Sequence, residues 1–195
     1  MSVKKSIVVH DYNPAWASEF ETLKAVFVEH VGDDIVDIEH VGSTSIPGLK
    51  AKPVIDVDIV VSSTKKLQRV IGKLEKLGYR HVGDLGITGR EAFKRRDDKT
   101  PDTEAQRVWM KHNLYVCIQG SIGLANHLKF RDYLKAHPVK IKEYSALKQG
   151  LAEQFPNDID AYIDGKTDFI VEILRRSGMS EHHADLIDGE NRLKN

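Results

Sequence analysis

The sequence predicts an α/β (α+β) fold in which a mixed β-sheet is followed by a C-terminal helical segment. Short runs rich in Val and Ile alternate with helical patterns as far as about residue 118. Beyond it, three helical patterns follow one another, separated by Pro138 and by Pro156-Asn157. A chain of 195 residues fits one hydrophobic core. We therefore expect a single domain over residues 1–177, including these helices, and a polar tail over residues 178–195 that can fray.

The N-terminal part supplies most of the predicted sheet. Ile7–Val9 is predicted as a short strand, and Asn13 and Pro14 are typical of the start of a helix that runs to about Val31. Steps of four, three and four residues place one stripe of this helix in the core: Trp16, Phe20, Leu23 and Phe27. Strands are expected over 35–41 and 54–61, and an amphipathic helix over 64–77.

The rest of the chain contributes shorter strands and then the helices. Strands are predicted over 79–82, around 91–94 and over 113–118, with a polar exposed loop over 97–106. Phe93 and Trp109 flank this loop; they could stack on a base, but packing against the sheet is the expected role. The three helices are predicted over 122–136, 139–155 and 159–175.

Composition and charge narrow the function classes. Lys plus Arg and Asp plus Glu both number 29, so no global positive field favours nucleic acid or anionic membranes. Cys117 is the single cysteine, which excludes an intrachain disulfide and a CxxC zinc site. The sequence has neither a signal-peptide-like start nor an apolar run long enough to span a membrane. We expect a cytoplasmic protein without a membrane partner.

Asp56 and Asp58 form a DVD pattern in the clearest predicted strand. Alternate side chains of a strand point to opposite faces, so these two carboxylates share one face. Carboxylates this close repel each other unless a cation or hydrogen-bond donors compensate, and Mg²⁺ is the usual cation. An isolated DxD pair can also simply face water. The opposite face is expected to carry Ile55, Val57, Ile59 and Val61.

The loop before this strand strengthens the metal interpretation. Residues 42–48 read GSTSIPG, in which the glycines allow close approach of a ligand to the backbone. The amides and hydroxyls of Ser43, Thr44 and Ser45 could cradle phosphate oxygens. The loop lacks the GxxxxGK[ST] spacing of a P-loop, and the sequence has no GxGxxG after a strand, no GxSxG and no HExxH. A phosphate-binding loop beside a metal-binding strand is the predicted combination.

Residues 39–49 (EHVGSTSIPGL), continued by residues 51–58 (AKPVIDVD), resemble the GrpB family. The similarity covers roughly the whole chain. It continues through Arg90, residues 112–116, residues 130–134, Tyr144, Leu147-Lys148 and residues 162–166. GrpB-like domains also resemble the C-terminal extension of some dephospho-CoA kinases, so a kinase label can reach such a chain without a P-loop.

The resemblance implies a nucleotidyltransferase-like core similar to that of the DNA polymerase beta superfamily. In that superfamily a GS loop precedes a DxD strand, and a later strand carries a third carboxylate. By this resemblance Gly42 and Ser43 would hold nucleotide phosphates, while Asp56 and Asp58 would ligate Mg²⁺ or Mn²⁺. The strand expected to carry the third carboxylate has none, which weakens two-metal nucleotidyl transfer.

Basic residues complete the candidate phosphate site. Helical spacing turns Arg131, Lys148 and Lys166 toward the core, where a cation needs an anion. Lys52 lies between the loop and the DVD strand, and Arg90 lies in a Gly-rich turn. All five could bind phosphate. The alternatives are solvated surface positions for Lys52 and Arg90 and, for the helical cations, ion pairs with Asp132, Glu143, Asp164 or Asp168.

Two histidines lie near the proposed site. We expect His112, which begins a predicted strand, to act in the site and partly replace the missing carboxylate as a base, metal ligand or phosphate donor. For His40, which precedes the loop, a structural role is equally expected.

These patterns together predict a Mg²⁺-dependent nucleotide-binding protein that acts as a nucleotidyltransferase on a small-molecule or protein acceptor. The alternative is a non-catalytic accessory module that binds a nucleotide or phosphate and has lost transfer activity. The predicted ligand in either case is a nucleoside triphosphate or a related phosphate ester. Binding of nucleic acid ranks below both, because the charge is balanced and no basic stripe is present.

Overall fold

The computed structural model describes residues 6–87 and 89–192, and a five-stranded sheet lies at its centre. The strand order is β1-β2-β5-β4-β3. β2 and β5 are parallel and the other pairs are antiparallel, so the predicted mixed sheet is confirmed. The strands are β1 (Asp37–Val41), β2 (Ile55–Val61), β3 (Tyr79–His81), β4 (Arg90–Arg95) and β5 (His112–Ile118).

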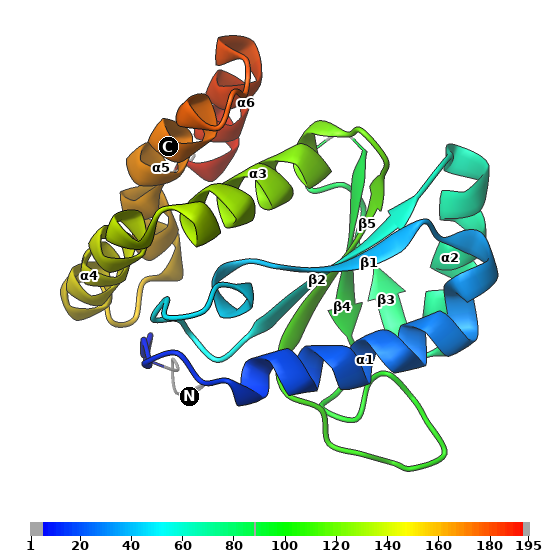
Figure 1. Ribbon diagram of the computed structural model, residues 1–195. Coiled ribbons are helices and arrows are strands. Elements are labelled where there is room, and N and C mark those ends of the chain that lie inside the picture. Colours follow the sequence, from blue (N-terminus) through cyan, green and yellow to red (C-terminus); the bar gives the residue numbers. More distant parts are fainter. Residues whose placement is uncertain (1–5, 88, 193–195) are drawn as a thin grey trace.

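Helices cover both faces of this sheet (Figure 1). α1 (Ala15–Val31) and α2 (Thr64–Lys76) pack on one face, and α3 (Ile122–Ala136) crosses the other. α4 (Pro138–Gln154), α5 (Ile159–Arg176) and α6 (Glu181–Asn191) lie together beyond α3. Two short 3₁₀ helices, η1 (Gly32–Asp34) and η2 (Ser43–Ser45), flank β1. The predicted C-terminal helical segment is therefore confirmed.

The main core lies between the sheet and the helices α1 and α2. The stripe predicted on α1 is buried there against the inward side chains of β2. At the start of this helix the Asn13 Oδ1 atom accepts a hydrogen bond from the Ala15 N–H at 3.0 Å, which satisfies one free donor of the first turn. At α2 the Ser63 hydroxyl accepts from the Lys66 N–H in the same way. Both helix starts thus depend on local polar side chains.

The strand predicted at Ile7–Val9 is wrong. These residues adopt no strand, and the adjoining His10 makes only an isolated antiparallel bridge with Ala51. Ile7 and Val9 instead pack against Leu151, Ala152 and Tyr162 of α4 and α5. Apolar periodicity over three residues indicated burial correctly, but it did not distinguish a strand from an extended segment that packs on helices.

The polar tail expected after Ser177 is also a correction, because residues 181–191 form α6. The Ser180 hydroxyl caps this helix by accepting from the His183 N–H. Ala184 and Ile187 are buried against α5 and α3. Arg175 of α5 pairs with Glu181 at 2.7 Å. A few apolar residues at helical spacing suffice to dock a short helix that is polar on average.

No helix among the described residues combines the length and apolar character that crossing a membrane requires.

Candidate functional site

β2 places Asp56 and Asp58 on the face of the sheet that α3 crosses, as the strand alternation predicts. Ile55, Val57 and Ile59 point to the opposite face and are buried in the main core. Residues paired across strands share a face. Asp56 pairs with Asn113 of β5, and Asp58 pairs with Glu39 of β1 and Tyr115 of β5. The α3 face therefore gathers three carboxylates and an amide on adjacent strands: Glu39, Asp56, Asp58 and Asn113.

Gly42 allows the loop after β1 to approach Asp56. Its φ is +66°, a left-handed conformation that side chains rarely adopt, and a Cβ atom there would collide with Asp56 Oδ2. The backbone of the loop thus lies directly against the carboxylate, as a phosphate-binding loop beside a DxD strand requires.

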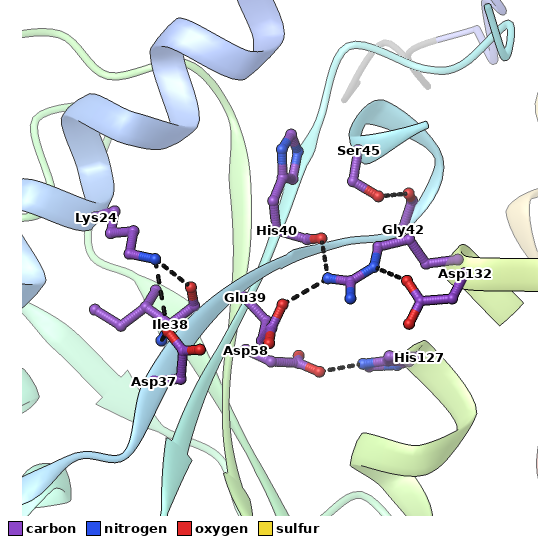
Figure 2. A network of polar contacts seen from close by, with 11 residues as sticks. Lys24, Asp37, Ile38, Glu39, His40, Gly42, Ser45, Asp58, His127 and Asp132 are labelled. Atoms are coloured by element: carbon purple, nitrogen blue, oxygen red, sulfur yellow. Dashed lines mark hydrogen bonds and ion pairs between the residues drawn. The ribbon is translucent and has the colours of Figure 1, made fainter. Parts of the chain in front are cut away.

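The hydroxyls of the loop do not all face a ligand. Thr44 Oγ1 donates to the Val54 carbonyl at 3.1 Å. Ser45 Oγ donates to the Gly42 carbonyl at 2.7 Å (Figure 2). Both residues are buried. Their hydroxyls hold the loop in shape, whereas Ser43 lines a cavity beside Asp56. The predicted cradle of three hydroxyls is reduced to that of Ser43.

That cavity, here called the lysine cavity, has a volume of about 250 Å³. The residues that matter for its chemistry are Ser43, Asp56, Lys52, Lys111, Lys148 and Lys166. Lys52 and Lys111 precede β2 and β5, while Lys148 and Lys166 come from α4 and α5. Sequence positions more than a hundred residues apart thus meet at the end of β2 where Asp56 lies.

The four lysines of this cavity lack carboxylate partners. Within residues 6–87 and 89–192, none of their Nζ atoms forms an ion pair within 4.0 Å. Lys148, which is only 2% exposed, donates to Ser43 Oγ at 3.1 Å and to the Lys50 carbonyl. Lys52 and Lys166 lie over the Tyr162 ring, at 5.3 and 4.6 Å from its centroid. The ion pairs considered for Lys148 and Lys166 are therefore not formed.

Burial of these ammonium groups lowers their pKa values. Burial, followed by the charge of Lys52, lowers the pKa of Lys166 to about 8. The pKa of Lys148 is lowered well below its ordinary value by burial and by the charge of Lys166. Burial lowers the pKa of Lys52 as well, and the charge of Lys111 adds to that effect. In each case burial is the largest cause, the charge of a neighbouring lysine adds to it, and the charge of Asp56 acts in the opposite direction.

The two carboxylates of β2 have different surroundings. Asp58 is fully buried; its Oδ2 accepts from His127 Nδ1 of α3 at 2.7 Å, and its Oδ1 has no hydrogen-bond partner among the described residues (Figure 2). Burial acts to lower the pKa of His127, but the charge and hydrogen bond of Asp58 outweigh it, so this pKa is raised. Asp56 Oδ1 accepts from Asn113 Nδ2 at 2.7 Å, and burial raises the pKa of Asp56.

Arg131 reaches the sheet but forms structural ion pairs. It contacts Glu39 at 2.6 Å, Asp132 at 2.7 Å and the His40 carbonyl at 3.0 Å (Figure 2). The pairing with Asp132 was one of the alternatives to phosphate binding. Since two carboxylates already hold the guanidinium, Arg131 attaches α3 to β1 and does not line the lysine cavity.

Arg90 is also outside the lysine cavity. It is the first residue of β4, not part of a turn, and its guanidinium lies 4.8 Å from the centroid of the Tyr115 ring. Its Nε is buried without a hydrogen-bond partner among the described residues. Tyr115 follows Asn113 on the same face of β5, so Arg90 lies farther along that face than the lysines.

His112 is a correction, because its side chain lies on the face of the sheet away from Asp56. Its Nδ1 donates to the Met110 carbonyl at 2.9 Å, and its Nε2 accepts from the Tyr79 hydroxyl at 2.5 Å. Burial lowers its pKa to about 4. The error is one residue of register, since strand alternation turns Asn113 toward Asp56 and His112 away.

His40 has the structural role that was one of its two expected roles. It stacks on Phe20 with ring centroids 4.5 Å apart, and its Nε2 lies 3.0 Å from Thr44 Oγ1. Burial lowers its pKa to about 4. A histidine kept neutral in this way supports the loop through Thr44.

Sequence reasoning missed His127 and Lys111. His127 lies four residues before Arg131 and so falls on the same face of α3. That spacing could have identified it as a second polar residue facing the sheet. Lys111 immediately precedes β5, beside the strand that carries the DVD pattern, but only the strand order reveals this.

Comparison of the sequence with known proteins finds one matching family model and several similar proteins. The GrpB protein family model matches residues 6–176. UPF0157 protein YqkA of Bacillus subtilis is 39% identical over 171 residues, covering 86% of this chain and 46% of YqkA, so the chain spans about half the length of that relative. Glutamate-rich protein GrpB of Alkalihalophilus pseudofirmus is 33% identical over 172 residues, 88% of this chain and 95% of that protein.

Solved structures and a kinase complete the comparison. The crystal structure of conserved protein GrpB from Enterococcus faecalis has a TM-score of 0.73 and 30% identity, covering 87% of this chain and 96% of that one. Dephospho-CoA kinase of Mycolicibacterium paratuberculosis is 27% identical, covering 85% of this chain and 44% of the kinase. Cid1 in complex with ApU has a TM-score of only 0.44 at 10% identity over 72% of this chain and 44% of Cid1, which carries no conclusion about activity. The family match and the E. faecalis structure establish that this chain belongs to the GrpB family.

Proposed function

We propose that the protein binds a nucleoside triphosphate, or a related phosphate ester, in the lysine cavity together with Mg²⁺ or Mn²⁺, and transfers its nucleotidyl group to a small-molecule or protein acceptor. The observation that supports this most strongly is the set of four lysines without carboxylate partners beside Asp56. Buried ammonium groups are costly unless an anion compensates them. A triphosphate is an anion of matching charge, and Ser43 adds a hydroxyl at the same wall.

Asp56 lines the lysine cavity and would be the first carboxylate to meet a divalent cation that arrives with such a ligand. The buried Oδ1 of Asp58 lacks a hydrogen-bond partner among the described residues, and Asp56 projects from the same face two residues earlier. Mg²⁺ is usually held by one or two carboxylates plus phosphates of the substrate. Residues 6–87 and 89–192 contain no cluster of three or more His, Cys, Asp or Glu side chains that could hold a metal ion, so the proposed ion depends on phosphate oxygens for its remaining ligands. The bound ion would supply neutralisation of charge on the reacting phosphate.

The transfer step balances as an alcoholysis of the triphosphate. The acceptor hydroxyl oxygen forms the new bond to the α-phosphorus, and the bond from the α-phosphorus to the oxygen bridging the β-phosphate breaks. Pyrophosphate leaves with the electron pair, and the hydroxyl proton passes to solvent. The lysines of the cavity stabilise the charge of the leaving group.

One observation favours the second candidate, a module that binds the same ligand without transferring it. β5 places Asn113 and Tyr115 beside Asp56 and Asp58, so the strand carries no third carboxylate at the expected place. The absence of that group leaves no protein base for the incoming hydroxyl on β5. Release of pyrophosphate in the presence of an acceptor mixture would decide for transfer, and binding without release would decide for the module.

Titration calorimetry tests the binding proposal. Mg²⁺ and each of ATP, GTP, CTP and UTP are titrated into the wild type and into the variants Asp56→Asn/Asp58→Asn and Lys52→Met/Lys166→Met. Lys65→Met is the control, because Lys65 is exposed and lies outside the cavity. The proposal requires binding that both double variants lose and the control keeps. Equal binding by the wild type and both double variants, or none by any protein, would refute it.

A further inference from the structure

A second cavity adjoins the lysine cavity at the edge of the sheet. Its volume is about 480 Å³, and it lies where β4 ends and β5 begins. Lys111 and Asn113 line both cavities, so the two meet at these residues. The remaining residues that matter here are Phe93, Lys94, Arg95, Asp98 and Trp109.

We propose that this second cavity holds the nucleoside part of the ligand whose phosphate chain lies in the lysine cavity. This inference rests on the proposed function, because it assigns the remainder of the same ligand. It identifies the substrate class as a nucleotide rather than a bare polyphosphate.

Size is the first argument. Sites for small organic ligands usually enclose roughly 300–1,000 Å³, and the lysine cavity, at about 250 Å³, falls below that range. It suits a phosphate chain better than a complete nucleotide. The second cavity, of about 480 Å³, lies next to it and offers the missing space, since Lys111 and Asn113 belong to both walls.

Charge is the second argument, because the two cavities differ in what they offer a ligand. The lysine cavity presents cations and suits an anion. The second cavity presents both signs: Asp98 lines it together with Lys94 and Arg95, and the Asp98 carboxylate makes no ion pair within the described part of the chain. A nucleoside is neutral and carries hydroxyl and amino donors as well as ring and carbonyl acceptors, so it matches a wall of mixed sign.

Arg95 contributes a guanidinium to this wall. Its Nη1 and Nη2 atoms donate to the carbonyls of Met110 and Trp109 at 3.2 and 3.4 Å, and its buried Nε has no hydrogen-bond partner among the described residues. The guanidinium pairs with no carboxylate in that part of the structure. Phe93 and Trp109 add apolar surface to the same wall.

The two cavities meet beside the Asp56 carboxylate. Asn113, which lines both, donates to Asp56 at 2.7 Å. A ligand that spans the junction therefore places the atoms between its nucleoside and its terminal phosphates next to Asp56. Those atoms include the α-phosphorus, the centre at which nucleotidyl transfer occurs.

The test compares nucleotides with tripolyphosphate, which lacks the nucleoside. Both are titrated calorimetrically with Mg²⁺ into the wild type and into Lys94→Ala/Asp98→Ala, whose substituted side chains are exposed and so spare the fold. The control is Lys99→Ala/Glu104→Ala, which also removes one lysine and one carboxylate. Both residues are exposed in the loop between β4 and β5 and lie outside this cavity. We expect at least one nucleotide to bind the wild type about tenfold more tightly than tripolyphosphate, as one additional charge-assisted hydrogen bond would produce.

The Lys94→Ala/Asp98→Ala variant should lose that advantage and keep its affinity for tripolyphosphate, while the control keeps both. Tripolyphosphate binding without any advantage for nucleotides would overturn this inference and leave the anion site standing. Nucleotide affinity unchanged in the variant, with slower transfer to an acceptor, would assign the cavity to the acceptor and also overturn it. Failure of both ligands to bind would overturn the proposed function together with this inference.

Discussion

Two cationic clusters in this protein differ in how their charge is balanced. At the first, Lys66, Arg69 and Lys73 surround the single carboxylate of Asp34 at 3.0, 2.9 and 2.8 Å. Side-chain hydrogen bonds from Lys73 and Lys66 lower the pKa of Asp34 to about 2. At the second, the lysine cavity, four ammonium groups have no carboxylate within ion-pair distance in the described structure.

The difference teaches what each cluster is for. The Asp34 cluster ties α2 to the segment before β1 and contains its own anion, so it is complete without a ligand. The lysine cavity has cations with lowered pKa values, and among the described residues Asp56 is the one carboxylate that lines it. Under the proposed function a bound anion would stabilise a cluster of this second kind, whereas the first already contains its anion.

The largest expected effect comes from removing cations of the lysine cavity. Lys52→Met/Lys166→Met should weaken tripolyphosphate binding about hundredfold, because two charge-assisted contacts of roughly 1.5 kcal/mol each are lost. The same variant should unfold at an equal or higher temperature than the wild type without ligand, since like charges have been removed. Calorimetric titration and thermal unfolding measure the two quantities. If the ligand-free variant unfolded at a lower temperature than the wild type, the conclusion that the lysines of this cavity repel one another without a ligand would be wrong.

A smaller but still large effect is expected at Gly42, on which the shape of the cavity wall depends. Gly42→Ala places a methyl group against Asp56 Oδ2 and forces a left-handed φ on alanine. We expect a loss of about 1–3 kcal/mol in the free energy of unfolding, measured with urea. Gly48→Ala is the matched control: its φ is +81° but its Cβ meets no atom within 4 Å, so the difference between the variants isolates the collision.

The Asp34 cluster should lose its contribution in acid. The pKa of Asp34 is lowered from 3.8 to about 2, so the stabilisation is present above pH 4 and disappears as pH falls toward 2. Asp34→Asn should therefore be less stable than the wild type at pH 7, and the difference should shrink between pH 4 and pH 2. Urea unfolding at several pH values measures it. A difference that is constant with pH would show that the ion pairs do not produce it.

The smallest expected effect is a pH dependence of the same sign at Lys166, in alkaline solution. Its pKa is lowered to about 8, below the ordinary value of 10.5, so the unfolded chain binds the proton more tightly between these values. Ligand-free wild type should therefore gain stability relative to Lys166→Met as pH rises from about 8 to 10.5. Thermal unfolding over this range provides the measurement. Stability that falls relative to the variant would mean that Lys166 has a partner in solution.

Local patterns predicted much of this fold and some of the site. The alternation of β2 placed Asp56 and Asp58 on one face, and helical spacing turned Lys148 toward the interior, as the structure confirms. Alternation failed at His112 only because the register of this residue against Asp56 depends on how β5 pairs with β2, which no local pattern contains. The meeting of Lys111 with Lys166 likewise depends on strand order and helix packing, so the sequence alone left it hidden.

The attachment of α3 has a mechanical consequence. His127 and Arg131 lie one helical turn apart on α3. His127 pairs with Asp58 of β2, and Arg131 pairs with Glu39 of β1 (Figure 2). A single residue, His137, separates the end of α3 from the start of α4, which carries Lys148. α3 therefore connects the strands that carry Glu39 and Asp58 to the helix that supplies Lys148, so one helix joins the carboxylates to a lysine of the cavity.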